Sequence, residues 1–279
     1  MAITAAEVNK LRHMTGAGMM DCKKALEEAK GDYEKASEII RKKGQLIAAK
    51  RADREASEGI VLSNVSAEGT FGVLTVLCSE TDFVAKNENF LKFATSINNL
   101  ALAQKPSDLV ALKQLKLDSL TISDAIMGQL SVIGEKIDLI NYGKIEAAQV
   151  IAYIHPGNKL ATLVGFNKKL SDAQIGKDIA MQIAAMSPVA VDKDVVPAEV
   201  VAKEKEIAIE QTRLDKKNEG KPANILEKIA EGKLEKFFKE NTLLNQEFIK
   251  DTKLTVRDYL KSTDKDLTVT QFIRYTLNA

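Results

Sequence analysis

The sequence predicts an α+β fold with three parts: an N-terminal three-helix bundle, a duplicated core in which each half is a β-hairpin followed by a helix, and an antiparallel αα coiled-coil hairpin. Three patterns indicate this fold. Apolar residues recur at helical spacing through about the first 50 positions. Paired β-branched runs followed by an amphipathic helix occur twice, about 90 residues apart. A stretch rich in Lys and Glu, from Pro197 to Asn241, repeats apolar residues every seven positions.

Three short helices are expected in the first domain, residues 1–54. Thr4 and Glu7 have the spacing of a capping box, and later glycines mark helix ends. The expected helices cover residues 4–14, 19–30 and 32 to about 47. Residues 50–59 are charged and lack a wide apolar face, which is typical of a linker, so the first boundary is placed there.

The core is expected to consist of two similar halves, one at residues 55–145 and the other at 146–196 together with 242–279. Runs of apolar and β-branched residues around turn sequences predict a hairpin in each half. The predicted strands cover 60–62, 71–78, 148–154 and 160–166, and the helices after the two hairpins cover 87–104 and 172–186. Further helices are expected near 108–116, 121–133 and 255–260, and further strands at 136–145 and 267–275.

Residues 197–241 are expected to form a helical hairpin inserted in the second half. Asn218 to Pro222 interrupt the periodic pattern, so two antiparallel helices are predicted on either side of this turn. Their apolar stripe is too narrow to be buried on several sides. We therefore expect this hairpin to protrude from the core.

Composition excludes several classes of function. The 279 residues carry 40 Lys and Arg against 39 Asp and Glu, so no overall basic field attracts nucleic acid or anionic lipid. Trp is absent and aromatic residues make up 5%, which leaves few platforms for stacking bases. Two Cys and two His argue against a zinc site. The absence of long apolar segments predicts a cytoplasmic protein.

Enzyme signatures are missing from the sequence. The phosphate-binding loop, the dinucleotide-binding glycine pattern, the zinc protease motif and the nucleophile elbow are all absent. We therefore expect a binding protein without catalytic residues, metal ligands or a cofactor. Two alternatives remain open: a small-molecule enzyme with its site between the two α+β halves, and a peptide-binding adaptor that acts through the N-terminal bundle, which resembles a ubiquitin-associated domain.

Adjacent methionines, Met19 and Met20, begin the second predicted helix. Successive helical residues point about 100° apart, so the two side chains cannot both face one small core. At least one of them is therefore expected at the surface. Exposed methionines suit a protein-binding surface because their side chains adapt to a partner. The alternative is that both fill gaps in the three-helix core.

A second unusual segment, Ser79 to Asn87, places Asp82 beside Phe83 between a strand and a helix that is expected to begin only at Asn87. In one interpretation Thr81 or Asp82 caps the helix and Phe83 fills the core. In the other, Phe83 is an exposed wedge and Asp82 offers a carboxylate to a cation or a cation-binding site on a partner. His155, beside Pro156 and Gly157, is either a plain turn residue or part of the same function.

Four motifs in order resemble the elongation factor Ts family over essentially the whole chain. The first runs from Val8 to Leu26 and includes Arg12, Thr15-Gly16-Ala17-Gly18-Met19-Met20-Asp21 and Cys22-Lys23-Lys24-Ala25-Leu26. The others are Thr81-Asp82-Phe83-Val84-Ala85-Lys86-Asn87, then Tyr153-Ile154-His155 with Gly157 and Lys159, and Glu219-Gly220-Lys221-Pro222.

This resemblance implies a guanine-nucleotide exchange factor that binds elongation factor Tu in its GDP-bound and nucleotide-free states. It implies that Thr81, Asp82, Phe83 and Val84 enter the partner near its Mg²⁺ site, and that His155 supports the same face. It further implies partner contacts from the N-terminal bundle through Arg12, Met19, Met20 and Lys23, and from the region of Phe248 and Ile249. Nucleic acid and membrane are not expected as direct partners.

Overall fold

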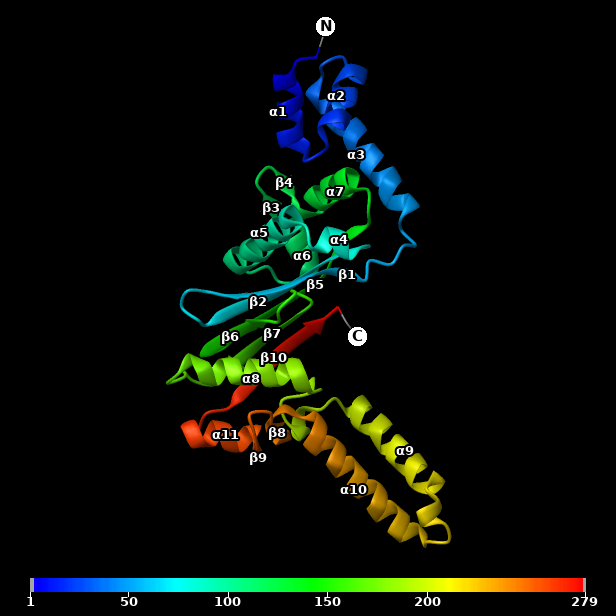
Figure 1. The fold of residues 1–279 in the computed structure, drawn as a ribbon, viewed down its shortest axis with the longest axis vertical. Helices are drawn as coiled ribbons and strands as arrows, with labels where there is room; N and C mark the ends of the chain where they lie inside the picture. The colour runs from blue at the N-terminus through cyan, green and yellow to red at the C-terminus, as the bar shows by residue number, and fades with distance from the viewer. Residues whose placement is uncertain (1–2, 278–279) are drawn as a thin grey trace. The chain divides into compact units, whose positions relative to one another are not determined.

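The computed structural model describes residues 3–277, which form helices and small β-sheets as the α+β prediction requires (Figure 1). The chain divides into two compact units. The first contains the chain as far as Lys144, residues 154–161 and the end of the chain from Tyr275, and the second contains 145–153 and 162–274. The four-part division expected from the sequence is finer than these two units and stays a prediction.

The first unit begins with the three expected helices, α1 (Ala5–Thr15), α2 (Met19–Glu28) and α3 (Tyr33–Lys50). Thr4 and Glu7 form the predicted capping box, and Gly16 ends α1 in the left-handed conformation, with φ of +68°. Buried side chains from all three helices make one apolar cluster around Leu11 and Leu26. The local capping signals were sufficient to predict these helices.

The first unit also contains a three-stranded sheet in the order β1-β2-β5, with α5 (Glu88–Gln104) packed on it. Its strands are β1 (Glu58–Val65), β2 (Phe71–Ser79) and β5 (Ile137–Glu146). β1 and β2 are antiparallel, with Gly59 opposite Cys78. A side chain at Gly59 is excluded because its Cβ would lie 2.3 Å from the carbonyl oxygen of Leu77.

Between α5 and β5 the chain forms α6 (Leu109–Gln114) and α7 (Ile122–Ile133). The helix predicted over 108–116 is too long at its C-terminal end: two short strands, β3 (Lys116–Leu117) and β4 (Leu120–Thr121), pair there instead. Pairing across a turn therefore overrides the helical periodicity of this segment. Asp118, with φ of +57°, lies in the turn that joins the two strands.

The second unit contains a sheet in the order β10-β7-β6, with α8 (Ala173–Met186) packed on it. Its strands, β6 (Gln149–Ile154), β7 (Leu160–Phe166) and β10 (Val269–Thr276), match the predicted ones closely. The other elements are η1 (Lys193–Val195), η3 (Leu243–Asn245), β8 (Glu247–Phe248), β9 (Asp251–Thr255) and α11 (Val256–Thr263). The β8–β9 hairpin was not predicted, because its strands are too short for a period-2 pattern.

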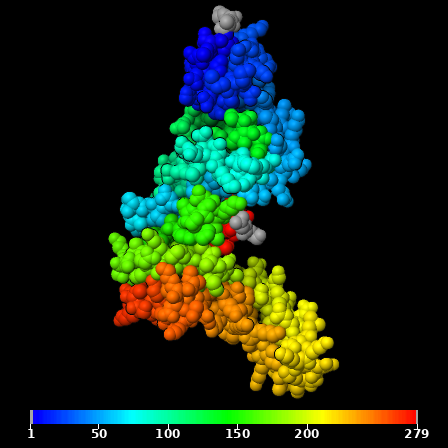
Figure 2. All heavy atoms as spheres, viewed as in Figure 1, coloured from blue at the N-terminus to red at the C-terminus, as the bar shows by residue number. Residues whose placement is uncertain are grey.

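The Lys- and Glu-rich segment forms two helices, α9 (Ala198–Leu214) and α10 (Ala223–Asn241), joined through η2 (Lys216–Asn218). The two helices lie side by side, as the yellow and orange atoms of Figure 2 show. Ala208 and Ala230 are the buried apolar residues of the pair, which agrees with the narrow stripe seen in the sequence. Among residues 3–277, no helix has the length and apolar character needed to cross a membrane.

Candidate functional site

The segment Thr81 to Val84 follows directly from the end of β2 in the first unit. Thr81 is extended, with φ of −123° and ψ of 153°, and a four-residue helix, α4 (Asp82–Ala85), comes next. The helix expected from Asn87 is confirmed as α5, whose N-cap is Asn87, but the single helical turn α4 before it was not predicted. Backbone hydrogen bonds from Ala85 to Thr81 and from Lys86 to Asp82 close that turn.

Phe83 projects into solvent, with 84% of its surface exposed. The interpretation of Phe83 as a core residue is therefore wrong. Val84, the next residue, packs partly against the core cluster of the first unit and so anchors the turn from its other side. Among the described large apolar side chains that are exposed, Phe83 has the highest exposed fraction. Its burial against a partner would be favourable by about 2 kcal/mol.

Asp82 lies beside Phe83 and forms an ion pair with Lys86, with 2.6 Å between Nζ and a carboxylate oxygen. The hydrogen bond from Lys86 is the main reason that the pKa of Asp82 lies below its ordinary value, and Lys159 adds a smaller effect. Asp82 is thus an anion at neutral pH. The pair is solvent-exposed, so Lys86 can release the carboxylate at little cost.

The turn that contains His155 packs beside Asp82 within the first unit. Gly157 and Asn158 both have positive φ, and the carbonyl of Asn158 accepts a hydrogen bond of 2.7 Å from the N–H of Val61 on β1. A hollow of about 220 Å³ lies between this turn and α4, lined by Gly59, Ile60, Asp82, Ala85, Lys86, Leu91, Gly157, Asn158 and Lys159. His155 itself is exposed, and the structure thus places two of the predicted motifs side by side.

The N-terminal candidates Arg12, Met19, Met20 and Lys23 are all exposed. Met19 is 46% exposed and Met20 is 64% exposed, so the alternative in which both fill the core is wrong. Cys22, two positions after Met20 and so on the other side of α2 from it, is buried instead. The two methionines therefore form an apolar surface at the start of α2.

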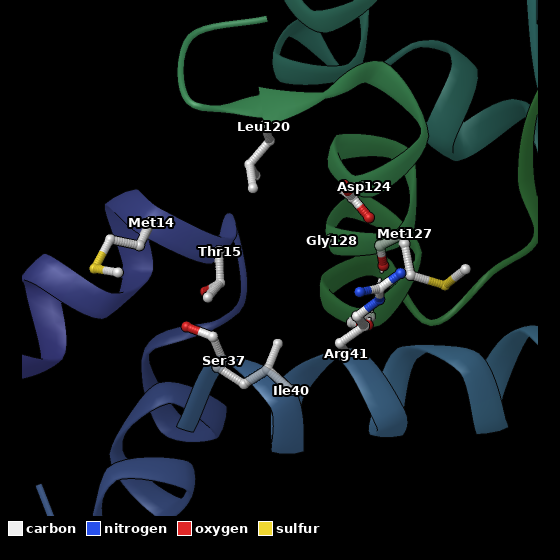
Figure 3. Close-up of a pocket in the computed structure, with 10 residues that line it drawn as sticks. Met14, Thr15, Ser37, Ile40, Arg41, Leu120, Asp124, Met127 and Gly128 are labelled. Carbon is white, nitrogen blue, oxygen red and sulfur yellow. Dashed lines mark hydrogen bonds between the residues drawn. The ribbon is translucent and has the colours of Figure 1, made fainter. Parts of the chain in front are cut away.

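A pocket of about 180 Å³ lies where α1, α3, β4 and α7 meet (Figure 3). Its side chains are mainly apolar or hydroxyl-bearing. The carboxylate of Asp124 accepts a hydrogen bond of 2.7 Å from the hydroxyl of Thr121, the N-cap residue of α7. Gly128 allows close packing, because a Cβ there would lie 3.0 Å from the carbonyl oxygen of Thr15. The pocket thus lies where α7 supports the loop before Met19.

Phe248 and Ile249 belong to the second unit. Phe248 is only 3% exposed and stacks on Tyr259, with 4.1 Å between ring centroids. The side chain of Phe248 is thus packed in the hydrophobic cluster of this unit, and contact of the region around Phe248 and Ile249 with a partner stays a prediction. Ile249 is exposed, and its N–H donates a 2.8 Å hydrogen bond to the side-chain oxygen of Gln182.

The described residues include neither a metal-binding cluster nor a reactive cysteine thiol. Within residues 3–277, no three His, Cys, Asp or Glu side chains are arranged to hold a metal ion. Cys78 is buried, and burial raises its pKa to about 12, so it is an unreactive thiol at neutral pH.

Comparison with known proteins identifies the family. The sequence pattern of the family described as Elongation factor TS matches residues 80–279. Proteins named Elongation factor Ts from Porphyromonas gingivalis and Amoebophilus asiaticus are each 51% identical to this chain, over the full length of both proteins. A third, from Bacteroides fragilis, is 41% identical and also matches over its full length. The chain belongs to the elongation factor Ts family.

The elongation factor Ts pattern begins at residue 80, so it includes the Thr81–Val84 segment, whereas the full-length relatives also cover the Met19 region. Sequence reasoning missed two residues at this site, Glu80 and Glu135. No local sequence pattern marks Glu135, because it is 54 positions away from Thr81, the residue that it contacts. Glu80 could have been found from its position directly before the Thr-Asp-Phe segment.

Proposed function

We propose that this chain promotes GDP release from elongation factor Tu by inserting Phe83, with Asp82 beside it, near the partner's Mg²⁺ and phosphate site. Membership of the elongation factor Ts family supports the general role, because that family acts in translation elongation as the nucleotide exchange factor of elongation factor Tu. The residues that carry out exchange are our own inference.

The exposure of Phe83 is the observation on which this proposal depends. A wedge must be accessible in the free protein and must be held firmly enough to transmit force into a partner. Val84 and the short helix α4 supply the anchoring, and the hollow beside Asp82 leaves room for a partner segment. His155, exposed on the neighbouring turn, supports the same face.

The energy that exchange requires is modest. Converting a nanomolar GDP site into a micromolar one takes about 4 kcal/mol of coupling between the exchange factor and the nucleotide. Burial of one phenylalanine contributes about 2 kcal/mol, and disturbance of Mg²⁺ coordination by a carboxylate supplies the remainder. Linkage requires that GDP weakens binding of this chain by the same factor.

The remaining contacts are proposed to give affinity. Met19 and Met20, with Arg12 and Lys23, engage the nucleotide-binding domain of the partner, and Ile249 lies against another of its domains. The chain binds elongation factor Tu in both its GDP-bound and nucleotide-free states, acts in the cytoplasm and has no catalytic residues of its own. Nucleic acid and membrane are not direct partners.

The finer architecture is part of the same proposal. Residues 1–54 form a binding module that resembles a ubiquitin-associated domain, and the halves at 55–145 and at 146–196 with 242–279 are a structural duplication. Each half contains a hairpin followed by a helix that packs on the sheet, which supports this interpretation. The antiparallel helices of 197–241 form a coiled-coil hairpin that is an accessory element.

The test is release of fluorescent GDP from elongation factor Tu, timed with and without this chain. We expect the unaltered chain to accelerate release and Phe83→Ala to slow it at saturation by about tenfold or more. A matched control is Phe237→Ala, which truncates a phenylalanine on α10, outside the proposed site. Normal acceleration by Phe83→Ala would contradict the wedge, and no acceleration by the unaltered chain would contradict the function itself.

A further inference from the structure

The turn that contains Phe83 is held by a residue from a distant part of the chain. Thr81 is the N-cap residue of α4, yet its side chain makes no capping hydrogen bond. Its N–H instead donates to one carboxylate oxygen of Glu135 at 3.1 Å, and its hydroxyl lies 2.9 and 3.0 Å from the two oxygens of the same group. Glu135 follows the C-terminal end of α7, so it ties the turn to that helix.

A second carboxylate reinforces this attachment one residue earlier. Glu80 accepts a 2.6 Å hydrogen bond from the N–H of Lys136 and two contacts of 2.7 and 2.9 Å from a guanidinium nitrogen of Arg51. The side chain of Glu80 is largely buried. Charge-assisted hydrogen bonds of this kind are stronger than neutral ones, so both ends of the Glu80–Thr81 pair are fixed.

The same network reaches the end of α3. The Lys136 ammonium donates to the carbonyl oxygens of Ala52 and Arg54, at 2.7 and 3.0 Å. Arg51, which contacts Glu80, is the C-cap residue of α3. The C-terminal end of α3 and the turn that contains Phe83 are therefore joined through one network of side chains, which includes Glu80 and Lys136.

From this geometry we infer that Glu135 is a positioning residue for nucleotide exchange. By holding Thr81, it fixes the direction in which Phe83 projects. This inference rests on the proposed function of Phe83. Without it, the hydroxyl and N–H of Thr81 turn to water, and α4, a single helical turn, samples other orientations. A wedge that is mobile in the free protein loses conformational entropy on insertion, which slows exchange.

The experiment compares Glu135→Ala and Glu135→Gln in the full chain. Glutamine keeps an acceptor oxygen for the Thr81 N–H and offers an amide N–H to its hydroxyl oxygen, so it preserves the attachment. We expect Glu135→Ala to lower the maximal GDP release rate by about tenfold, with the half-saturating concentration changed by less than about threefold. Glu135→Gln should stay within about threefold of the unaltered rate.

Asp138→Ala is the matched control, since Asp138 lies nearby on β5 and pairs with Lys113 rather than with Thr81. Hydrogen–deuterium exchange of the free proteins supplies a readout without the partner: the peptide containing residues 80–86 should exchange faster in Glu135→Ala than in Glu135→Gln or Asp138→Ala. If Glu135→Ala does not fold, as judged by circular dichroism, Thr81→Val, which removes only the hydroxyl, replaces it with the same readouts.

Three outcomes decide the inference. Unchanged deuterium uptake in residues 80–86 of Glu135→Ala would overturn it, whatever happens to exchange of GDP. A maximal rate equal to that of Asp138→Ala, when the unaltered chain is active, would also overturn it while leaving the proposed function intact. An unaltered chain that fails to accelerate GDP release contradicts the proposed function, and deuterium uptake still tests whether Glu135 holds the turn.

Discussion

Phe83 and Phe90 are phenylalanines seven positions apart with opposite surroundings. Phe90 is buried in the core cluster of the first unit, whereas Phe83 projects into solvent. Phe90→Ala should therefore destabilise the fold by about 3–5 kcal/mol, as buried aromatic truncations do. Phe83→Ala should change stability by less than about 0.5 kcal/mol. Thermal melts of the two isolated variants check this, and a similar loss in both would show that Phe83 is a core residue.

Asp82→Ala should slow GDP release from elongation factor Tu less than Phe83→Ala does. The proposed action of Asp82 is on the partner's Mg²⁺, so its effect should shrink when the metal is chelated, because the ion is then already gone. GDP release timed with and without chelator measures this difference. Asp264→Ala is the control, since Asp264 forms a comparable exposed pair with Lys168 in the second unit. A defect that is unchanged by chelation would contradict the role of Asp82.

The Met19 and Met20 surface should contribute affinity rather than maximal rate. Replacing both by Ala removes apolar contact but leaves the Phe83 turn in place, so complex formation should weaken by about tenfold with little change in exchange at saturation. Titration of the GDP release rate separates the two quantities. Met186→Ala, at an exposed methionine of the second unit, provides the comparison. A collapse of the saturating rate with unchanged affinity would be inconsistent with this assignment.

At the scale of elements, α9 and α10 contribute little to the core of their unit. Their buried apolar residues, Ala208 and Ala230, face each other's helix rather than the main hydrophobic cluster, which contains no residue of either helix. Deletion between Pro197 and Asn241 with a short Gly/Ser bridge should therefore leave a folded protein that retains exchange. Circular dichroism melts and GDP release together measure this outcome.

The bridge in that deletion must respect the base of the hairpin. The N–H of Val189 donates to the carbonyl of Asn241, and Ala190 pairs with Thr242, so Asn241 and Thr242 should be retained. A well-folded deletion variant that has lost all exchange would place the function in the helical hairpin instead of in the Phe83 turn.

At the scale of the whole molecule, several carboxylates make stability depend on pH. The N–H of Lys136 holds the pKa of Glu80 below its ordinary value of 4.5, against the opposing effect of burial. Burial alone would raise the pKa of Asp192, but hydrogen bonds from Arg257 and Asn245 bring it below its ordinary value of 3.8. Because both folded-state pKa values are lowered, the unfolded chain binds more protons in acid, and the free energy of unfolding falls there.

We expect stability to change little through these groups above about pH 5 and to decline below it. Asp192→Asn should cost about 1–2 kcal/mol at neutral pH, because it weakens the contacts that join η1 to η3 and α11. Its deficit should shrink as the pH falls below 3.8 through the folded-state pKa of Asp192. Urea unfolding between pH 3 and pH 7 measures both effects, and a deficit that is constant across this range would contradict the assignment.

The sequence by itself determined the longer helices and most strands, together with the family. Helices and strands are predictable because their signals act over a few residues and can be read from the amino-acid sequence. These signals are capping pairs, such as Thr4 and Glu7, and the alternating or helical spacing of apolar residues. The family motifs are likewise short local strings, and they singled out the Thr81–Val84 segment, whose role in exchange stays a prediction. Burial could not be predicted for Phe83 or Phe248, since residue type gives the same expectation for both.

Tertiary structure alone decided what surrounds the candidate site. Contacts between Thr81 and Glu135, and the position of the Asn158 turn beside Asp82, join residues far apart in the chain. Local periodicity contains no information about such pairings, because many arrangements of the same helices and strands satisfy it. The packed core selects one of them, and that selection leaves Phe83 exposed while it buries Phe90 and Phe248.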